Sequence, residues 1–133
     1  MARRMAGRLD ADETAFGNKV KDLAKRAGWL ENHTYRSKIN GAWRTTTTGI
    51  GFPDHLFVKQ GRLVVLELKM PGNKPTPQQV EWIELFDSVP GCVARVVWPA
   101  DWPWIVKALT SRLQTDHVNR ATLSADQPKE QLP

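Results

Sequence analysis

Apolar residues in the first part of the chain recur at the spacing of one face of an α-helix. The repeat follows the i, i+4, i+7, i+8 pattern of a buried stripe and consists of Phe16, Val20, Leu23, Ala24 and Ala27. Gly28 follows directly, and glycine commonly ends a helix. The pattern predicts an amphipathic helix over residues 12–27, with residues 1–11 as a basic arm before it.

Four later segments have the pattern of β-strands, namely residues 29–36, 54–59, 62–69 and 92–98. Gln60-Gly61 predicts a turn between the second and the third. Residues 63–66 are apolar on both faces, which is typical of a central strand covered on both sides. Residues 37–52 are rich in glycine and threonine and are predicted to form a loop.

Two further helices complete the pattern. Thr76 and Pro77 have the residue types favoured at the N-cap and first position of a helix, which should end near Pro90. Its inward positions are Val80, Ile83 and Phe86, and those of a helix after Asp101 are Ile105, Leu109 and Leu113. The order α-β-β-β-α-β-α predicts an α/β fold with a mixed central sheet flanked by helices. Residues 12–113 are predicted to form one domain, and residues 114–133 a flexible polar tail.

Composition and charge narrow the class of protein. The 133 residues include one cysteine, Cys92, so an intrachain disulfide is excluded, and Cys92 is expected in the core. The sequence has no apolar run long enough for a membrane span and no signal-peptide pattern. We therefore expect a soluble cytoplasmic protein, in the host cytoplasm if viral, without a membrane partner. Residues 1–52 carry 10 basic and 5 acidic side chains, whereas residues 53–133 carry 9 of each. This basic excess favours a polyanionic partner such as nucleic acid.

Candidate chemistry lies where the central strand breaks its apolar pattern. Glu67 and Lys69 are two residues apart on one strand, so they share a face with Leu63 and Val65. Asp54 begins the strand before the Gln60-Gly61 turn, and a tight hairpin would place it beside Glu67. Two neighbouring carboxylates repel unless a cation lies between them. A divalent ion that prefers oxygen ligands, Mg²⁺ or Mn²⁺, would remove that conflict, with Lys69 placed to hold a water or a phosphate oxygen.

A simpler interpretation is a buried ion pair of Lys69 with Glu67 or Asp54 and no chemistry. The preceding residues shift the balance towards a metal site. Pro53 fixes the backbone before Asp54, and Gly51 allows a sharp entry into the strand. A Pro-Asp pair followed after twelve residues by Glu-x-Lys is a fairly specific signature.

Two more residues have both a structural and a functional interpretation. Glu13 is predicted in the first turn of the first helix, where it could complete a capping box with Asp10 or supply a third carboxylate to the metal. Gln79 lies three residues after Thr76, where it could cap its own helix or face the site and orient water or a phosphate.

Together these residues resemble the VRR-NUC group of the PD-(D/E)xK nuclease superfamily. The resemblance covers residues 12–109 and rests on motifs in chain order. They are Glu13-x-x-Phe16, Leu23-Ala24, Gly28-Trp29, Gly51-Phe52-Pro53-Asp54, Leu66-Glu67-Leu68-Lys69, Pro77-Gln78-Gln79 and Val97-Trp98-Pro99-Ala100-Asp101-Trp102. His55 departs from the family, which usually has an aliphatic residue after Pro-Asp.

The resemblance implies a restriction-endonuclease-like core that cuts phosphodiester bonds with Mg²⁺ or Mn²⁺ and needs no small-molecule cofactor. It implies Asp54, Glu67 and the Leu68 carbonyl as metal ligands and Lys69 as the catalytic lysine. Glu13 matches the helix-borne acid of the family, and Gln79 its motif glutamine. Small stand-alone members of the family, found in phages, act as homodimers on branched DNA such as four-way (Holliday) junctions. A junction resolvase in phage-type replication or recombination is thus the leading expectation.

Other residues are candidates for DNA binding, although each also has a purely structural interpretation. Arg36, Lys38, Arg44 and the threonines at 45–48, Thr47 among them, could bind the DNA backbone or form an ordinary solvated loop. His33, Tyr35 and Trp43 could line the groove or be partly buried. The three histidines lack zinc spacing, and the sequence has no phosphate-binding glycine loop. A less selective restriction-like or nicking nuclease and a non-catalytic DNA-binding module are the alternatives.

Overall fold

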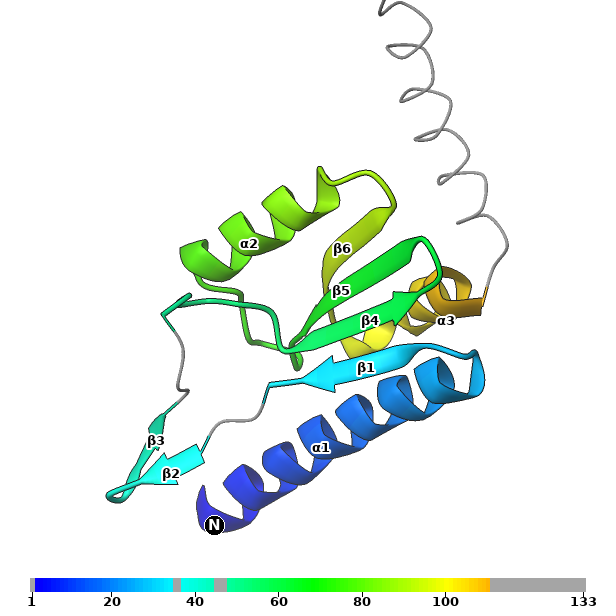
Figure 1. Ribbon diagram of the computed structural model, residues 1–133. Helices are drawn as coiled ribbons and strands as arrows, with labels where there is room; N and C mark the ends of the chain where they lie inside the picture. Colours follow the sequence, from blue (N-terminus) through cyan, green and yellow to red (C-terminus); the bar gives the residue numbers. More distant parts are fainter. Residues whose placement is uncertain (1, 35–36, 45–47, 111–133) are drawn as a thin grey trace, which may run out of the picture.

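The computed structural model describes residues 2–34, 37–44 and 48–110. The bounds of its elements are α1 Ala2–Arg26, β1 Leu30–His33, β2 Ser37–Ile39, β3 Ala42–Arg44, β4 His55–Lys59, β5 Arg62–Leu68, α2 Pro77–Asp87, β6 Cys92–Val97, the 3-10 helix η1 Pro99–Asp101 and α3 Trp102–Thr110. Apart from the extra β2–β3 hairpin, this is the predicted order α-β-β-β-α-β-α (Figure 1). The fold class is α/β, as expected.

Helix α1 is much longer than predicted. It has 25 residues and begins at Ala2, so residues 2–11, expected as an arm, form its first turns. The prediction of a start near Asp12 was wrong because it relied on the apolar stripe, which begins at Phe16. The preceding residues are mainly alanine, arginine, methionine and leucine, which have high intrinsic helix propensity.

The central sheet is mixed, with strand order β1-β4-β5-β6. β4 pairs antiparallel with both β1 and β5, whereas β5 and β6 run parallel and are joined through α2. β5 is central and contains Val64, Val65 and Leu66, all with no exposed surface. The apolar run of this strand is therefore explained by cover on both faces.

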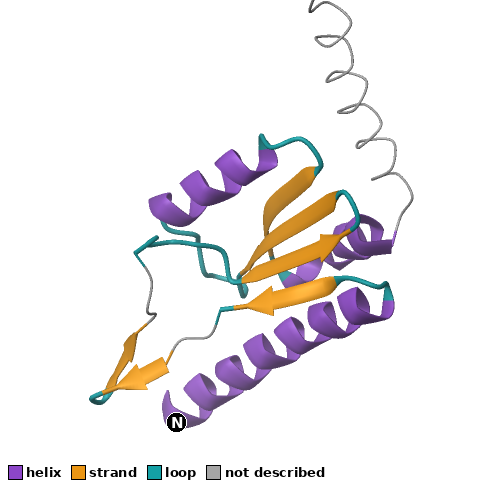
Figure 2. Ribbon diagram, viewed as in Figure 1, coloured by secondary structure: helices purple, strands orange, loops and turns teal. Residues whose placement is uncertain are grey.

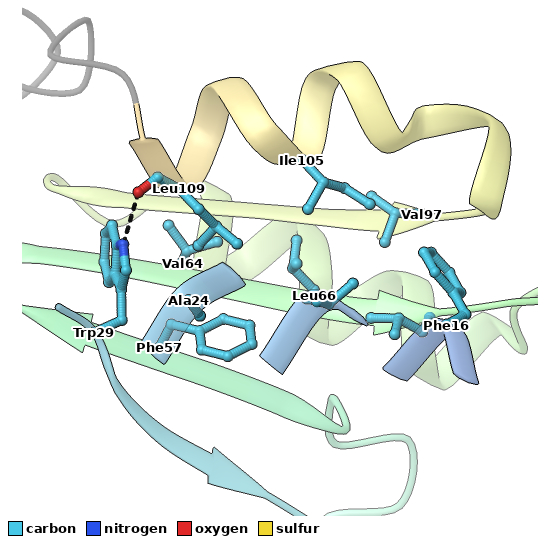
Figure 3. Close-up of a cluster of buried hydrophobic side chains, with 11 residues drawn as sticks. Phe16, Ala24, Trp29, Phe57, Val64, Leu66, Val97, Ile105 and Leu109 are labelled. Atoms are coloured by element: carbon cyan, nitrogen blue, oxygen red, sulfur yellow. Dashed lines mark hydrogen bonds between the residues drawn. The ribbon is translucent and has the colours of Figure 1, made fainter. Parts of the chain in front are cut away.

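Helices cover both faces of the sheet, α1 and α3 on one side and α2 on the other (Figure 2). The larger core lies between the sheet and α1 and α3 and is shown in Figure 3. Its buried members are Phe16, Val20, Ala24, Trp29, Phe57, Val64, Leu66, Leu68, Val97, Ile105 and Leu109. The smaller core beneath α2 includes Val65, Ile83 and Cys92, so the predicted burial of Cys92 is confirmed.

Trp29 links the corner between α1 and β1 to the last turn of α3. Its indole Nε1 donates a buried hydrogen bond of 2.8 Å to the Leu109 carbonyl near the end of α3, seen as the dashed line in Figure 3. The guanidinium of Arg62 lies 4.8 Å from the centre of the same ring. The α1–β1 corner and the last turn of α3 are therefore held together by one side chain.

The β2–β3 hairpin lies within the predicted loop of residues 37–52, so that part of the prediction was wrong. The hairpin forms its own two-stranded sheet and stands apart from the central sheet (Figure 1). Asn40 and Gly41 both have positive φ, 51° and 80°, which suits a two-residue hairpin turn. The Asn-Gly pair was the signal that could have predicted it.

The remaining boundaries agree with prediction to within a few residues. β1 is shorter than expected and ends at His33, and α2 ends at Asp87 rather than near Pro90. Ile105 and Leu109 of α3 are buried as predicted, whereas Leu113 and the tail 114–133 lie outside the described residues. Within the described part of the chain, every helix is too short or too polar to cross a membrane.

Candidate functional site

The β4–β5 hairpin brings Asp54 next to Glu67. In its register His55 lies opposite Leu66, so the residue that precedes β4 lies level with Glu67 near the end of β5. The backbone amide of Asp54 donates a hydrogen bond of 3.2 Å to Oε2 of Glu67. The two residues therefore converge at one end of the sheet, as the hairpin spacing predicted.

Glu67 is a buried carboxylate, 1% exposed. Burial, together with the neighbouring charge of Asp54, raises its pKa from 4.5 to about 7. Lys69 and the amide of Asp54 act in the opposite direction because they stabilise the charged form. Nζ of Lys69 lies 3.4 Å from Oε1 of Glu67, and its side chain keeps 19% of its surface exposed. Lys69 thus reaches both the buried carboxylate and solvent.

Gln79 caps its own helix, as one of its two predicted roles required, and its side chain also contacts Glu67. Its Oε1 accepts a 2.9 Å hydrogen bond from the backbone amide of Thr76. The backbone amide of Gln79 in turn donates to Oγ1 of Thr76, which completes a capping box. Its Nε2 donates a 2.9 Å hydrogen bond to Oε1 of Glu67. Because Thr76 holds Oε1 of Gln79, the side-chain amide is oriented so that Nε2 points to Glu67.

The loop before Asp54 is packed against the first turns of α2. Gly51 has a φ of 85°, and a Cβ on it would lie 2.7 Å from the Gln78 carbonyl carbon and 2.8 Å from the Gln79 nitrogen. Only glycine allows this approach together with this backbone conformation. Nε1 of Trp82 also donates to the carbonyl of Ile50, at 3.1 Å. The Asp54 loop and the Gln79 turn are therefore positioned as a unit.

On the other face of the sheet, a cavity of about 230 Å³ lies between α1 and the strands. Its lining residues are Glu13, Thr14, Gly17, Asn18, Lys21, His33, Asp54, His55 and Leu68. Glu13 therefore shares a cavity with Asp54 and Leu68. It lies in the interior of α1, so the alternative that it caps the first turn of this helix was wrong. Gly17 and Lys21 were not predicted as site residues.

His55 is buried and stacked rather than turned towards solvent. Its ring lies 4.1 Å from that of His33, centre to centre, and 6.0 Å from that of Phe57. Burial, together with the charges of His33 and Lys21, lowers the pKa of His55 to about 3. The imidazole is therefore neutral near pH 7 and packs as an aromatic ring where an aliphatic residue was expected.

Asp54, Glu67 and the Leu68 carbonyl remain the predicted ligands for Mg²⁺ or Mn²⁺. This donor set fits a hard cation because it consists of oxygen atoms, and because a divalent charge would offset the repulsion that raises the pKa of Glu67. Among residues 2–34, 37–44 and 48–110, no group of three or more His, Cys, Asp or Glu side chains is arranged to hold a metal ion. Glu13, on α1, is not clustered with Glu67, which faces α2.

Of the predicted DNA-binding residues, Lys38 and Arg44 belong to the β2–β3 hairpin. Lys38 lies opposite Trp43, and Arg44 opposite Ser37. Arg36 and Thr47 lie outside the described residues. The hairpin and its neighbouring segments, residues 32–53, contain no acidic residue.

No protein-family model matches this chain, and no curated protein is significantly similar to it.

The raised pKa of Glu67 predicts how stability depends on pH. The unfolded chain ionises this carboxyl near pH 4.5, whereas the folded protein resists ionisation until about pH 7. Between these values the folded state binds more protons, so Glu67 lowers the free energy of unfolding as pH rises, by about 3 kcal/mol in total. Urea denaturation in EDTA from pH 5 to 8 should show this fall in the wild type relative to Glu67→Gln. The lowered pKa of His55 has the opposite effect but is common to both proteins, and parallel curves would contradict the prediction.

The double role of Gln79 predicts a separation between two neighbouring substitutions. Thr76→Ala removes the hydroxyl cap and should cost about 1 kcal/mol of stability without changing site chemistry. Gln79→Ala removes the cap and also the hydrogen bond to buried Glu67, so it should lower stability by roughly 2 kcal/mol. Thermal denaturation of both variants and the wild type checks the difference. Equal losses of stability in the two variants would show that the hydrogen bond to Glu67 adds nothing to the cap.

Proposed function

We propose that this protein is a metal-dependent DNA endonuclease that hydrolyses phosphodiester bonds with Mg²⁺ or Mn²⁺. The observation that carries the proposal is the surroundings of Glu67, a buried carboxylate in contact with Asp54, Lys69 and Gln79. These residues match, in order and spacing, the motif of the VRR-NUC group. A restriction-endonuclease-like core with β5 at its centre is part of this proposal.

Each residue has a definite task in the proposed reaction. Asp54, Glu67 and the Leu68 carbonyl would hold the cation, which supplies Lewis acidity at the scissile phosphate and lowers the pKa of the attacking water. Gln79 orients the Glu67 carboxylate by donating to Oε1. Lys69, with its ammonium partly exposed, stabilises the charge that develops on the phosphate or orients the water. Attack in line with the leaving oxygen would give a 3′-hydroxyl and a 5′-phosphate, as the resemblance implies.

An ion pair without chemistry explains the site less well. Such a pair needs only Glu67 and Lys69, whereas here the charge of Asp54 is held beside Glu67 and raises its pKa. Placing a second carboxylate against a buried one destabilises the folded protein unless a cation is bound. The arrangement is therefore the one expected of a cation site.

Branched DNA, such as a four-way junction, is the proposed substrate, and a homodimer the proposed assembly. Both follow from the resemblance to small stand-alone VRR-NUC proteins. The basic first part of the chain and the projecting β2–β3 hairpin, with Lys38 and Arg44, support DNA binding. Leu30 and Val58 are cross-strand partners with 77% and 50% of their surfaces exposed, and this apolar surface supports contact with a second copy.

Incubation with labelled DNA in Mg²⁺ or Mn²⁺ tests the substrate class. A four-way junction, a flap and a linear duplex of the same sequence should be compared, and we expect the junction to be cut fastest. Equal cutting of the linear duplex would favour a restriction-like or nicking nuclease. Binding without cutting of any substrate in either metal would contradict the enzyme proposal and favour a DNA-binding module.

Asp54→Ala should abolish cleavage while DNA binding persists. We expect a loss of about 1,000-fold in rate, as when several kcal/mol of metal-derived transition-state stabilisation is removed. Asp22→Ala is the matched control, because Asp22 is an exposed residue of α1 that forms an ion pair with Arg26 across one helical turn. Cleavage rates and anisotropy-based affinities should be measured on both proteins. Near-normal cleavage by Asp54→Ala would show that the site is wrongly assigned.

A further inference from the structure

The cavity between α1 and the sheet contains a feature that helix stability does not favour. Gly17 lies in the interior of a 25-residue helix, where glycine costs about 1 kcal/mol relative to alanine. Its residue surface is buried, yet a Cβ built on it would meet no atom within 4 Å. Neither close packing nor a positive φ therefore explains the glycine, and the space beside it is the cavity itself.

The residues of α1 that line this cavity, called the slot below, lie in two rows along the helix. Glu13, Gly17 and Lys21 are spaced at i, i+4 and i+8, so they form one row along α1, and Thr14 and Asn18 form the next row. At 1.5 Å per residue, about 12 Å of helix separates Glu13 from Lys21. The missing side chain therefore lies midway between a carboxylate and an ammonium.

The chemistry of the lining changes along this slot. Its lining includes the acidic residues Glu13 and Asp54 and the basic residue Lys21. The side chain of Lys21 is 24% exposed, and its Nζ lies 4.0 Å from Oε1 of Glu31. Thr14 and Asn18 also line the slot. Lysine, threonine and asparagine side chains are typical contacts of nucleic-acid phosphates.

His55 also lines the slot. Its Nδ1 atom is buried and has no hydrogen-bond partner among the described residues.

We propose that this slot holds one sugar–phosphate unit of the DNA strand next to the scissile bond, with its phosphate at Lys21. The inference rests on the proposed nuclease function and adds a substrate-positioning site to it. At about 230 Å³ the cavity is smaller than the roughly 300–1,000 Å³ of pockets for whole small molecules, which suits one unit of a chain that continues outside. Gly17 keeps the slot open, and Lys21 draws the phosphate away from the carboxylates of Asp54 and Glu13.

Substitutions that fill the slot test this inference, and Ala11→Leu on an exposed part of α1 is the control. Gly17→Ala should raise the melting temperature by roughly 2–6 °C, because alanine stabilises the helix and its Cβ meets nothing. Gly17→Leu should weaken DNA binding about tenfold, as when one or two phosphate hydrogen bonds are lost. Ala11→Leu should bind as the wild type does. Affinities are measured by fluorescence anisotropy with a labelled junction in EDTA, so that binding is observed without cleavage.

Lys21→Ala provides the decisive comparison. Alone it should weaken binding and reduce the slope of log affinity against log salt by about one, because one phosphate contact is lost. In the Gly17→Leu protein the same change should have little further effect, since the phosphate is already excluded. Wild-type affinity and salt dependence in Gly17→Leu, or full additivity of the two changes, would overturn the inference. Failure of the wild type to cleave DNA would instead contradict the nuclease proposal, and the binding data would still decide on the slot.

Discussion

Glu67 carries an ionisable group into the interior of the sheet, and much of the surrounding structure limits the cost of burying that charge. The Gln79 amide, the Asp54 backbone amide and the Lys69 ammonium all point at its two oxygens. Each partner comes from a different element, so the carboxylate can be satisfied only when α2, β5 and the start of β4 are in place. The charge of Asp54 works against this arrangement, and that residual conflict is what makes the site suited to a cation.

The two faces of the sheet divide the tasks of the proposed site. The α2 face holds Glu67 and fixes it through a capping box and the glycine contact at Gly51. The α1 face is more open and contains the cavity with Glu13, Gly17 and Lys21. Asp54 lies at the end of the sheet, in contact with Glu67 and in the cavity lining, so it connects the two sides. Chemistry and strand positioning would then meet at this residue.

Local spacing predicted the parts of this structure that depend on neighbours in the chain. The Gln60-Gly61 turn determines which residue lies beside Glu67, and Thr76-Pro77 determines where α2 begins. The predictions of the hairpin and of the start of this helix are both confirmed. The start of α1 was missed because helix propensity, rather than an apolar stripe, extends it to Ala2. The stacking of His55 on His33 could not be predicted, because it depends on the pairing of β1 with β4, two segments 22 residues apart. Gln79 was predicted to be either a cap or a site residue. Its spacing from Thr76 does not reveal that the same side chain caps α2 and donates to Glu67.

Gly17 makes α1 less stable than alanine would at the same position, and the proposed slot accounts for this. A helix interior favours alanine, and the structure leaves room for its methyl group, so selection for stability alone would replace this glycine. The same logic applies to Glu67, where an amide would avoid the cost of burying a charge. Both positions lie close to Asp54. Residues that lower stability are found mainly at functional sites, because selection for stability alone would replace them.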